Sequence, residues 1–138
     1  MLKEAFRILK PGGFIKISTP DLQKYVKSYG DDSTLKAETA LHAKDWIYSG
    51  FYNAVNYIPV DDYFQAHFVN DIFLNYEHHF IYDFLSLKRI LENAGFRNII
   101  NCDPNESIHD EFNNIETHIS DFDRHFTLYV EAEKLLNE

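Results

Sequence analysis

The sequence predicts a small α/β domain in which several helices cover a sheet of about three strands. Apolar residues recur at helical spacing in several segments, and short segments rich in β-branched and aromatic residues lie between them. The chain has 138 residues, of which 45% are hydrophobic, and this suffices for one core. We therefore expect a single domain that spans residues 1–138.

The first predicted strand, residues 14–18, follows a helix over residues 2–9. This helix is expected to end before Pro11, because a residue that precedes proline avoids the helical backbone conformation. Gly12 and Gly13 then permit a tight turn. Alternation along the strand defines two faces, one with Phe14 and Lys16 and the other with Ile15 and Ile17.

A second helix is expected to begin at Thr19-Pro20-Asp21. Thr19 suits the N-cap, Pro20 suits the first helical position, and Asp21 complements the positive end of the helix dipole. The same residues lie just past the carboxyl end of a strand, where ligands bind in open α/β sheets. Thr19 and Asp21 are therefore candidate substrate-binding residues, and helix capping is the simpler explanation for them.

The middle of the chain is rich in aromatic residues. Helices are expected over residues 34–50 and 61–76, with a loop over residues 50–59 between them. Aromatic side chains are frequent from Trp46 to Tyr76. They would either line a pocket for a flat or apolar ligand or, more simply, form core and a partner interface.

The last third predicts one helix and two strands. The helix carries Leu87, Ile90, Leu91 and Ala94 on one face, with Asp83 or Ser86 as its cap and Gly95 just past its end. The expected strands cover residues 96–102 and 126–132, and the tail over residues 133–138 is expected to fray.

The composition excludes several classes of protein. A net charge of −9 disfavours nucleic-acid binding, which requires concentrated Lys and Arg. No apolar run approaches the ~20 residues of a membrane span, and the N-terminus lacks the apolar region of a signal peptide. Cys102 is the single cysteine, so no internal disulfide forms, and no basic residue lies beside it to activate the thiol. We expect a soluble, cytoplasmic protein with no nucleic-acid or membrane partner.

Three segments carry a family resemblance. The first runs from Glu4 to Gly13, ends in Leu-Lys-Pro-Gly-Gly, and leads through a strand into Thr19-Pro20-Asp21-Leu22. The second is Tyr82-Asp83 followed by Leu87, Leu91, Ala94, Gly95 and Phe96, and the third runs from Tyr129 to Lys134. In this order they resemble the C-terminal half of the S-adenosylmethionine-dependent methyltransferases with a Rossmann-like fold.

The resemblance implies a partial Rossmann-like fold and an activity. The last strand would lie antiparallel between strands 13–18 and 97–102 in a small mixed sheet. The chemistry would be transfer of a methyl group from S-adenosyl-L-methionine to a small-molecule acceptor. The glycine-rich turn that holds this cofactor follows a strand in the family, whereas Gly12-Gly13 follows a helix. We therefore expect the chain to form the acceptor side and to be inactive without a cofactor-binding half.

A half domain implies two further expectations. The outer edge of strand 13–18 would carry unpaired backbone groups, which favours a homo-oligomer that continues the sheet across a two-fold axis. A non-catalytic interaction module derived from a methyltransferase is the alternative function.

His78, His79 and Tyr82 are the side chains best suited to acid–base chemistry. They fall in the region that forms the acceptor pocket in the family that the chain resembles. The resemblance makes these three the candidate catalytic residues, because His or Tyr can act as a general base or orient an acceptor. Tyr82 is also a candidate substrate-binding residue. The plainer explanation is that Tyr82 packs, the histidines lie on the surface or in the core, and Asp83 caps a helix.

No metal site is expected. The seven histidines show no His-Glu-x-x-His arrangement. Glu116, His118 and Asp121 are conceivable metal ligands, but oxygen and nitrogen donors in a polar loop are more often solvated.

Overall fold

The computed structural model describes residues 1–29, 69–70, 72–73, 78–116 and 121–136. The chain forms two compact units, one made of Met1–Asp21 with Tyr82–Glu138 and the other of Leu22–Ile81. The predicted helix over residues 34–50, the loop after it and most of the aromatic-rich segment lie outside the described residues. The first unit holds the sheet.

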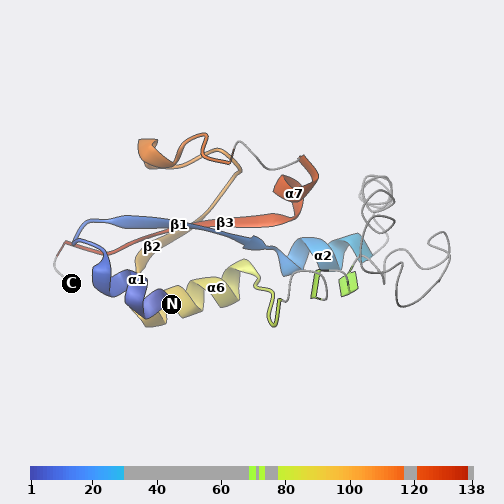
Figure 1. The fold of residues 1–138 in the computed structure, drawn as a ribbon, viewed down its shortest axis with the longest axis horizontal. Coiled ribbons are helices and arrows are strands. Elements are labelled where there is room, and N and C mark those ends of the chain that lie inside the picture. The colour runs from blue at the N-terminus through green and yellow to red at the C-terminus, as the bar shows by residue number, and fades with distance from the viewer. Residues whose placement is uncertain (30–68, 71, 74–77, 117–120, 137–138) are drawn as a thin grey trace. The chain divides into compact units, whose positions relative to one another are not determined.

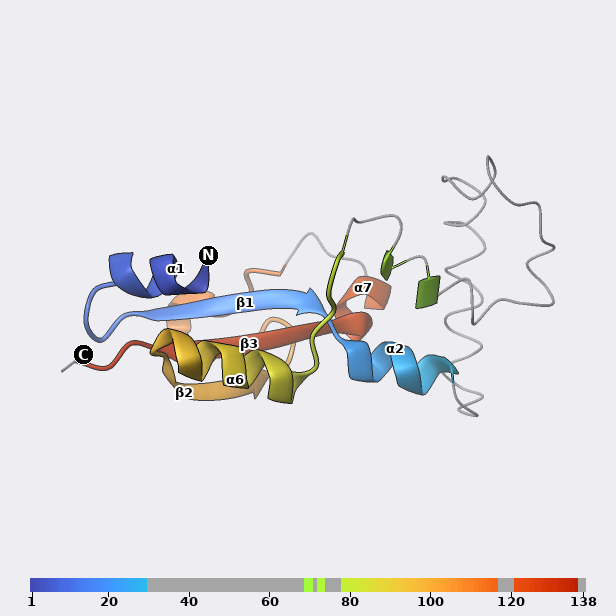
Figure 2. The same ribbon diagram turned by 90° about the horizontal axis from the view of Figure 1, so that it is seen from below.

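The sheet has three strands in the described residues, β1 (Phe14–Pro20), β2 (Arg97–Cys102) and β3 (Thr127–Glu133). Their order is β1-β3-β2, and both neighbouring pairs are antiparallel (Figures 1 and 2). The last strand therefore lies in the middle, which confirms the expected order. The prediction of a mixed sheet is wrong for the described strands. β1 and β2 each pair only with β3, and both pairs are antiparallel.

Two helices, α1 (Leu2–Ile8) and α6 (Phe84–Ala94), lie on one side of this sheet (Figure 1). The start of α6 is a capping box, in which the Asp83 carboxylate accepts the Ser86 N–H at 2.8 Å and the Ser86 hydroxyl accepts the Asp83 N–H at 3.2 Å. These hydrogen bonds hold the pKa of Asp83 below its usual value. The helix ends at Gly95 with φ 111°, so both predicted ends of α6 are confirmed.

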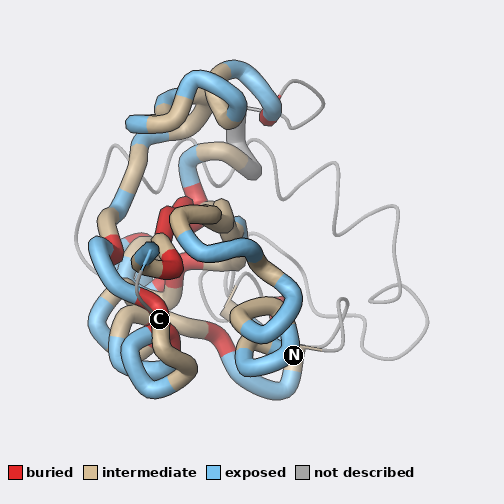
Figure 3. The backbone as a smooth tube through the Cα atoms, turned by 90° about the vertical axis from the view of Figure 1, so that its left-hand side faces the viewer, coloured by how far each residue is buried: buried red, intermediate tan, exposed pale blue. Residues whose placement is uncertain are grey.

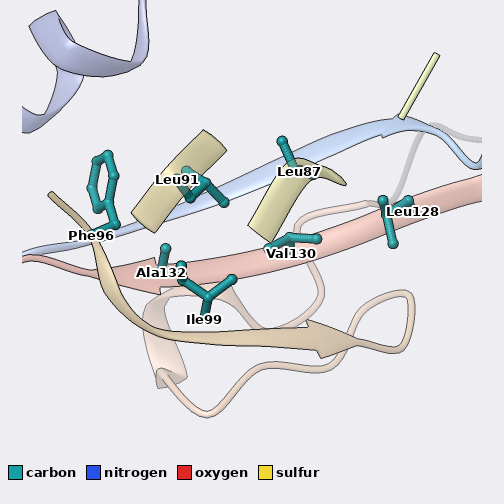
Figure 4. Packing of buried hydrophobic residues seen from close by; sticks show 7 residues of the cluster. All are labelled: Leu87, Leu91, Phe96, Ile99, Leu128, Val130 and Ala132. Atoms are coloured by element: carbon teal, nitrogen blue, oxygen red, sulfur yellow. The ribbon is translucent and has the colours of Figure 1, made fainter. Parts of the chain in front are cut away.

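The apolar core lies between α6 and the sheet. Figure 4 shows the buried residues of this cluster, with Leu87 and Leu91 on α6 and Val130 on β3. Leu91, Phe96 and Val130 are fully buried. Figure 3 colours the backbone by burial, with buried residues in red and exposed residues in pale blue. The members of the cluster are Leu87, Leu91, Phe96, Ile99, Leu128, Val130 and Ala132.

The end of α1 is joined to this core through Phe6. The Phe6 ring meets Phe96 edge-on at 5.1 Å between centroids, and it lies so close to Gly95 that a Cβ there would fall 2.7 Å from a ring atom. Gly95 is therefore required both for its left-handed conformation and for the approach of α1.

The opposite face of the sheet is covered by residues 103–116, which include the short 3-10 helix η1 (Asp110–Phe112) (Figure 1). Phe14 of β1 stacks on His109 with centroids 3.6 Å apart and meets Phe112 edge-on at 5.1 Å. After this segment, α7 (Asp121–Phe126) leads directly into β3. The two faces of the sheet are thus covered by different kinds of structure, helices on one and an irregular segment on the other.

Two local predictions are wrong. Thr19 and Pro20 do not begin a helix but end β1, where they pair with Leu128 and Thr127, and α2 (Leu22–Tyr29) begins two residues later. The tail does not fray at Lys134, which is buried and donates hydrogen bonds from Nζ to the Phe6 and Leu9 carbonyls, each at 2.9 Å. In both places long-range partners override the local signal.

The described residues of the second unit are helical at α2 and at positions 69–70 and 72–73, the latter within the predicted helix over residues 61–76. Among the described residues, no helix has the length and apolar character needed to cross a membrane.

Candidate functional site

The carboxyl end of β1 brings together three segments of the first unit. Asp21 follows the strand, is only 6% exposed, and donates its N–H to the Phe126 carbonyl at 2.9 Å. Tyr82 forms a parallel β-bridge with Asp21. Two of the predicted site residues, more than sixty positions apart in sequence, therefore lie side by side where the sheet ends.

Tyr82 is held from both directions. It is half-buried and packs against the apolar core cluster, and the next residue, Asp83, is fixed by the capping box of α6. The backbone of Tyr82 is therefore fixed at this end of the sheet by its bridge to Asp21 and by the helix cap that follows it. The prediction that Tyr82 lies beside a helix start is confirmed.

The other predicted site residues have different outcomes. Thr19 is a half-buried residue of β1 that pairs with Leu128, one position before the bridge. His78 is half-buried and His79 is exposed, and both belong to the unit Leu22–Ile81. The structure thus brings Asp21 and Tyr82 together and assigns the two histidines to the other unit.

A second cluster of chemical groups lies on the face of the sheet that residues 103–116 cover. The Lys16 side chain is 3% exposed, and its ammonium lies 2.9 Å from a Glu116 carboxylate oxygen. The same ammonium donates to the Glu106 carbonyl at 2.9 Å and approaches the Phe112 carbonyl at 3.4 Å. One buried cation therefore fixes three points of the covering segment onto β1.

Glu116 connects this cluster to the rest of the covering segment. Its second carboxylate oxygen accepts the Asn105 N–H at 2.7 Å, and the Asn105 side chain accepts the Glu116 N–H at 3.1 Å. Its carbonyl accepts a hydrogen bond from Arg124 of α7 at 3.2 Å. The Glu116 carboxylate is thus paired and hydrogen-bonded, which is the condition for burying such a charge.

Glu131 of β3 is the third charged member and is 1% exposed. Its nearest cation is the Lys16 ammonium, 3.9 Å from the closer oxygen, and no N–H or O–H donor among the described residues reaches either oxygen. Cys102 pairs with Tyr129, two residue pairs further along the β2–β3 ladder. Burial, and then the negative charge of Glu131, raise the pKa of the Cys102 thiol to about 11. This thiol is a poor nucleophile at neutral pH, as its sequence surroundings predicted.

Lys16 and Glu131 were not predicted to be members of a cluster. The prediction that Lys16 lies on the face opposite Ile15 and Ile17 is confirmed, because both isoleucines pack on the apolar core. The available signal was a charged residue inside each of two strongly apolar strands, at positions that alternation assigns to the face away from the helices.

The conceivable metal ligands do not form a site in the described residues. No group of three or more His, Cys, Asp or Glu side chains there is arranged to hold a metal ion. His118 and the Asp121 side chain lie outside the described residues, and the Glu116 carboxylate is held by Lys16.

The described residues do not fit the cofactor that the resemblance implies. Gly12 adopts φ 76° and donates its N–H to the Lys134 carbonyl at 2.8 Å, and Gly13 donates to the Lys10 carbonyl at 2.8 Å. A Cβ on Gly13 would lie 2.9 Å from that carbonyl oxygen. These glycines close a helix-to-strand turn on the protein's own backbone, whereas a cofactor cradle needs a strand, glycines and then a helix N-terminus.

No family model, curated protein or solved structure matches this chain.

Proposed function

We propose that this chain forms the acceptor side of an S-adenosylmethionine-dependent methyltransferase. The observation that carries the proposal is the pairing of Asp21 with Tyr82 at the carboxyl end of β1. In the Rossmann-like fold that the resemblance implies, ligands bind at the carboxyl ends of the strands. The Leu-Lys-Pro-Gly-Gly turn before β1 and the position of β3 between β1 and β2 are the arrangement that the resemblance implied. The cofactor would be bound by a glycine-rich turn that these 138 residues do not contain.

In this proposal Asp21 and Tyr82 position the acceptor. A carboxylate has about four acceptor sites, so Asp21 can take a hydrogen bond from an acceptor hydroxyl or amine besides those within the protein. The Tyr82 phenol can donate to the same acceptor or orient it. Rigid placement of the acceptor is the main contribution that such a site makes to the rate.

A melting titration with S-adenosylhomocysteine tests this proposal. It is run on the 138-residue chain and on the native assembly, which is the natural polypeptide that carries these residues with any chain that copurifies. Ligand that binds the folded state raises stability by RT ln(1 + [L]/Kd), about 1.4 kcal/mol when the concentration is ninefold above Kd. We expect this rise for the assembly and a flat melting temperature for the chain alone.

Two results would contradict parts of the proposal. A melting temperature of the assembly that does not change with S-adenosylhomocysteine concentration would contradict the proposal that the assembly is a methyltransferase. A concentration-dependent rise for the chain alone would mean that these residues hold the cofactor themselves, contrary to the turn geometry of Gly12 and Gly13.

A second candidate function is a non-catalytic interaction module. The edge position of β1 in the described sheet favours it, because an edge strand offers backbone groups to another chain. An assembly that does not bind S-adenosylhomocysteine, but whose association depends on this edge of β1, would favour the interaction module over the enzyme.

A further inference from the structure

Residues 105–116, which we call the lid, form a closed loop over the charged face of the sheet. We propose that the lid opens as a unit while the apolar core stays folded, with Lys16 and Phe14 of β1 as its latch. The inference concerns access to the buried charges beneath the lid and does not depend on the proposed function. Figure 1 shows this segment on the side of the sheet opposite to α1 and α6.

The lid is closed at its base by hydrogen bonds between its two ends. The Glu116 carboxylate accepts the Asn105 N–H at 2.7 Å, and the Asn105 side-chain oxygen accepts the Glu116 N–H at 3.1 Å. The Asn105 carbonyl also accepts the Asn114 N–H at 3.1 Å. Compact surface loops of about 6–16 residues whose ends meet in this way frequently carry function. Because its ends hold each other, the lid is expected to form or to be lost as one piece.

The lid has no apolar core of its own. Glu116 is its only buried residue, and none of its residues belongs to the apolar core cluster or packs against it. Its two isoleucines, Ile108 and Ile115, are 67% and 50% exposed. Burial of apolar area is the main term that offsets the entropy of an ordered chain. A lid without such burial cannot keep its conformation once it leaves the sheet, so its release is also its unfolding.

The polar half of the latch is Lys16, whose side chain is 3% exposed. Its ammonium donates to the Glu106 carbonyl at 2.9 Å, approaches the Phe112 carbonyl at 3.4 Å, and pairs with the Glu116 carboxylate at 2.9 Å. These three contacts reach the beginning, the middle and the end of the lid. At its last residue the lid is also held by Arg124 of α7, which donates to the Glu116 carbonyl at 3.2 Å.

The aromatic half of the latch is Phe14. It stacks on His109 with ring centroids 3.6 Å apart and meets Phe112 edge-on at 5.1 Å. The apolar core uses the other face of the same strand, where Ile15 and Ile17 pack on the cluster. The latch and the core therefore share β1 but no side chain, so the latch can be released while the core remains intact.

Closure of the lid carries a cost at Glu131. This residue is 1% exposed, and no N–H or O–H donor among the described residues reaches its carboxylate oxygens. The Lys16 ammonium, which holds the lid, lies 3.9 Å from the closer oxygen. A carboxylate that is buried without hydrogen bonds loses its hydration without compensation. Opening of the lid returns water to this group, so the lid is held closed by a smaller free energy than the core.

Native-state hydrogen exchange of the full chain tests this inference. The amides of Asn105, Phe112, Asn114 and Glu116 are hydrogen-bonded within the lid, whereas Val130 lies in the middle strand of the sheet. After correction for intrinsic rates, we expect the four lid amides to exchange at least about tenfold faster than Val130, with a shallower dependence on urea because their opening exposes less surface. Equal exchange rates and equal urea dependence for the lid and Val130 would overturn the inference.

A defect in the core separates opening of the lid from global unfolding. Leu91→Ala leaves a cavity beneath α6 and should accelerate Val130 at least about tenfold, while the lid amides stay within about twofold of wild type. Ile99→Val makes a smaller defect in the same cluster and repeats the comparison if Leu91→Ala does not fold. Lid amides that accelerate by the same factor as Val130 would show that the lid opens only when the whole protein unfolds.

A defect in the latch tests whether the lid opens as one unit. His109→Ala removes the stack on Phe14 without changing the sheet, and it should accelerate the amides of Asn105, Phe112 and Glu116 by one common factor of at least about five. Ile108→Ala is the matched control at the neighbouring exposed position, with an expected change within about twofold. Acceleration confined to the amides beside position 109, or equal effects of the two variants, would contradict the proposed lid.

Discussion

The two faces of β3 bury side chains of opposite chemistry. Leu128, Val130 and Ala132 meet the helices in a cluster without polar side chains, whereas the buried Tyr129 and Glu131 both lie near the Lys16 ammonium. Burial of apolar area is non-directional, so the first face depends on volume and filling. A buried charge depends on the partner at a fixed place, so the second face depends on which member of the cluster is removed.

The largest effect is expected from Lys16→Met, which keeps the length of the side chain but removes the only cation near Glu131 among the described residues. Removing one partner of a buried ion pair leaves an uncompensated charge and costs about 3–5 kcal/mol. Here it leaves two carboxylates, and it removes the Lys16 hydrogen bonds that hold the segment 103–116 on β1, while the contacts of Phe14 with His109 and Phe112 remain. Urea unfolding measures the loss, and hydrogen exchange of residues 103–116 should increase.

Glu131→Gln is the matched control for this cluster. Since no N–H or O–H donor in the described part of the chain reaches the Glu131 oxygens, the amide replaces a charge without breaking such a hydrogen bond, and Lys16 keeps Glu116. We expect a change in unfolding free energy of about 1 kcal/mol or less. Equal costs for the two variants would show that the cluster does not depend on Lys16 in the way described.

On the apolar face, Leu91→Ala is expected to cost about 2–5 kcal/mol, because Leu91 is fully buried and its loss leaves a cavity between α6 and β3. Leu85→Ala is the control on the same helix. Leu85 is 74% exposed, so its truncation should stay within about 0.5 kcal/mol. Similar losses for both variants would contradict the assignment of the α6 face that packs on the sheet.

The smallest effect concerns Cys102. With a pKa of about 11 instead of 9.0, the thiol at pH 8.5 holds about 100-fold less thiolate, and alkylation by iodoacetamide should be slower by a similar factor than in the urea-unfolded chain. The folded state also retains its proton at higher pH than the unfolded state. Stability should therefore fall as pH rises from about 9 to 11, and Cys102→Ser should reduce that slope. Alkylation rates within threefold of each other would contradict the burial of this thiol beside Glu131.

The same contrast explains how much the sequence could predict. The apolar face was predictable, because Leu87 and Leu91 repeat at helical spacing, the Asp83 and Gly95 ends are local signals, and the β-rich run over residues 126–132 alternates. The charged face was not, because the partners of Lys16 are carbonyls of a segment some ninety residues away with no periodicity of its own. Local rules carry no information about such contacts.

Within three residues, Thr19 to Asp21, the candidate site holds one local prediction that is wrong and one that is confirmed. Thr19 and Pro20 have good helix-start chemistry, yet pairing with β3 extends the strand through them. An edge strand tolerates Pro20 because its missing N–H would have pointed outward. Asp21 was located correctly at the end of the strand, but its bridge to Tyr82 is a long-range contact that no local pattern predicts.

The most direct test of the proposed function is transfer of a labelled methyl group. The native assembly is incubated with methyl-tritiated S-adenosylmethionine and a protein-free metabolite extract of cells that make the protein. Wild type is compared with Asp21→Asn, Tyr82→Phe and the exposed control Ser18→Ala. We predict label in a small-molecule fraction for wild type and Ser18→Ala, with at least about a tenfold loss in the two site variants at unchanged melting temperature. No incorporation by wild type, or equal incorporation by all variants, would contradict the proposed function.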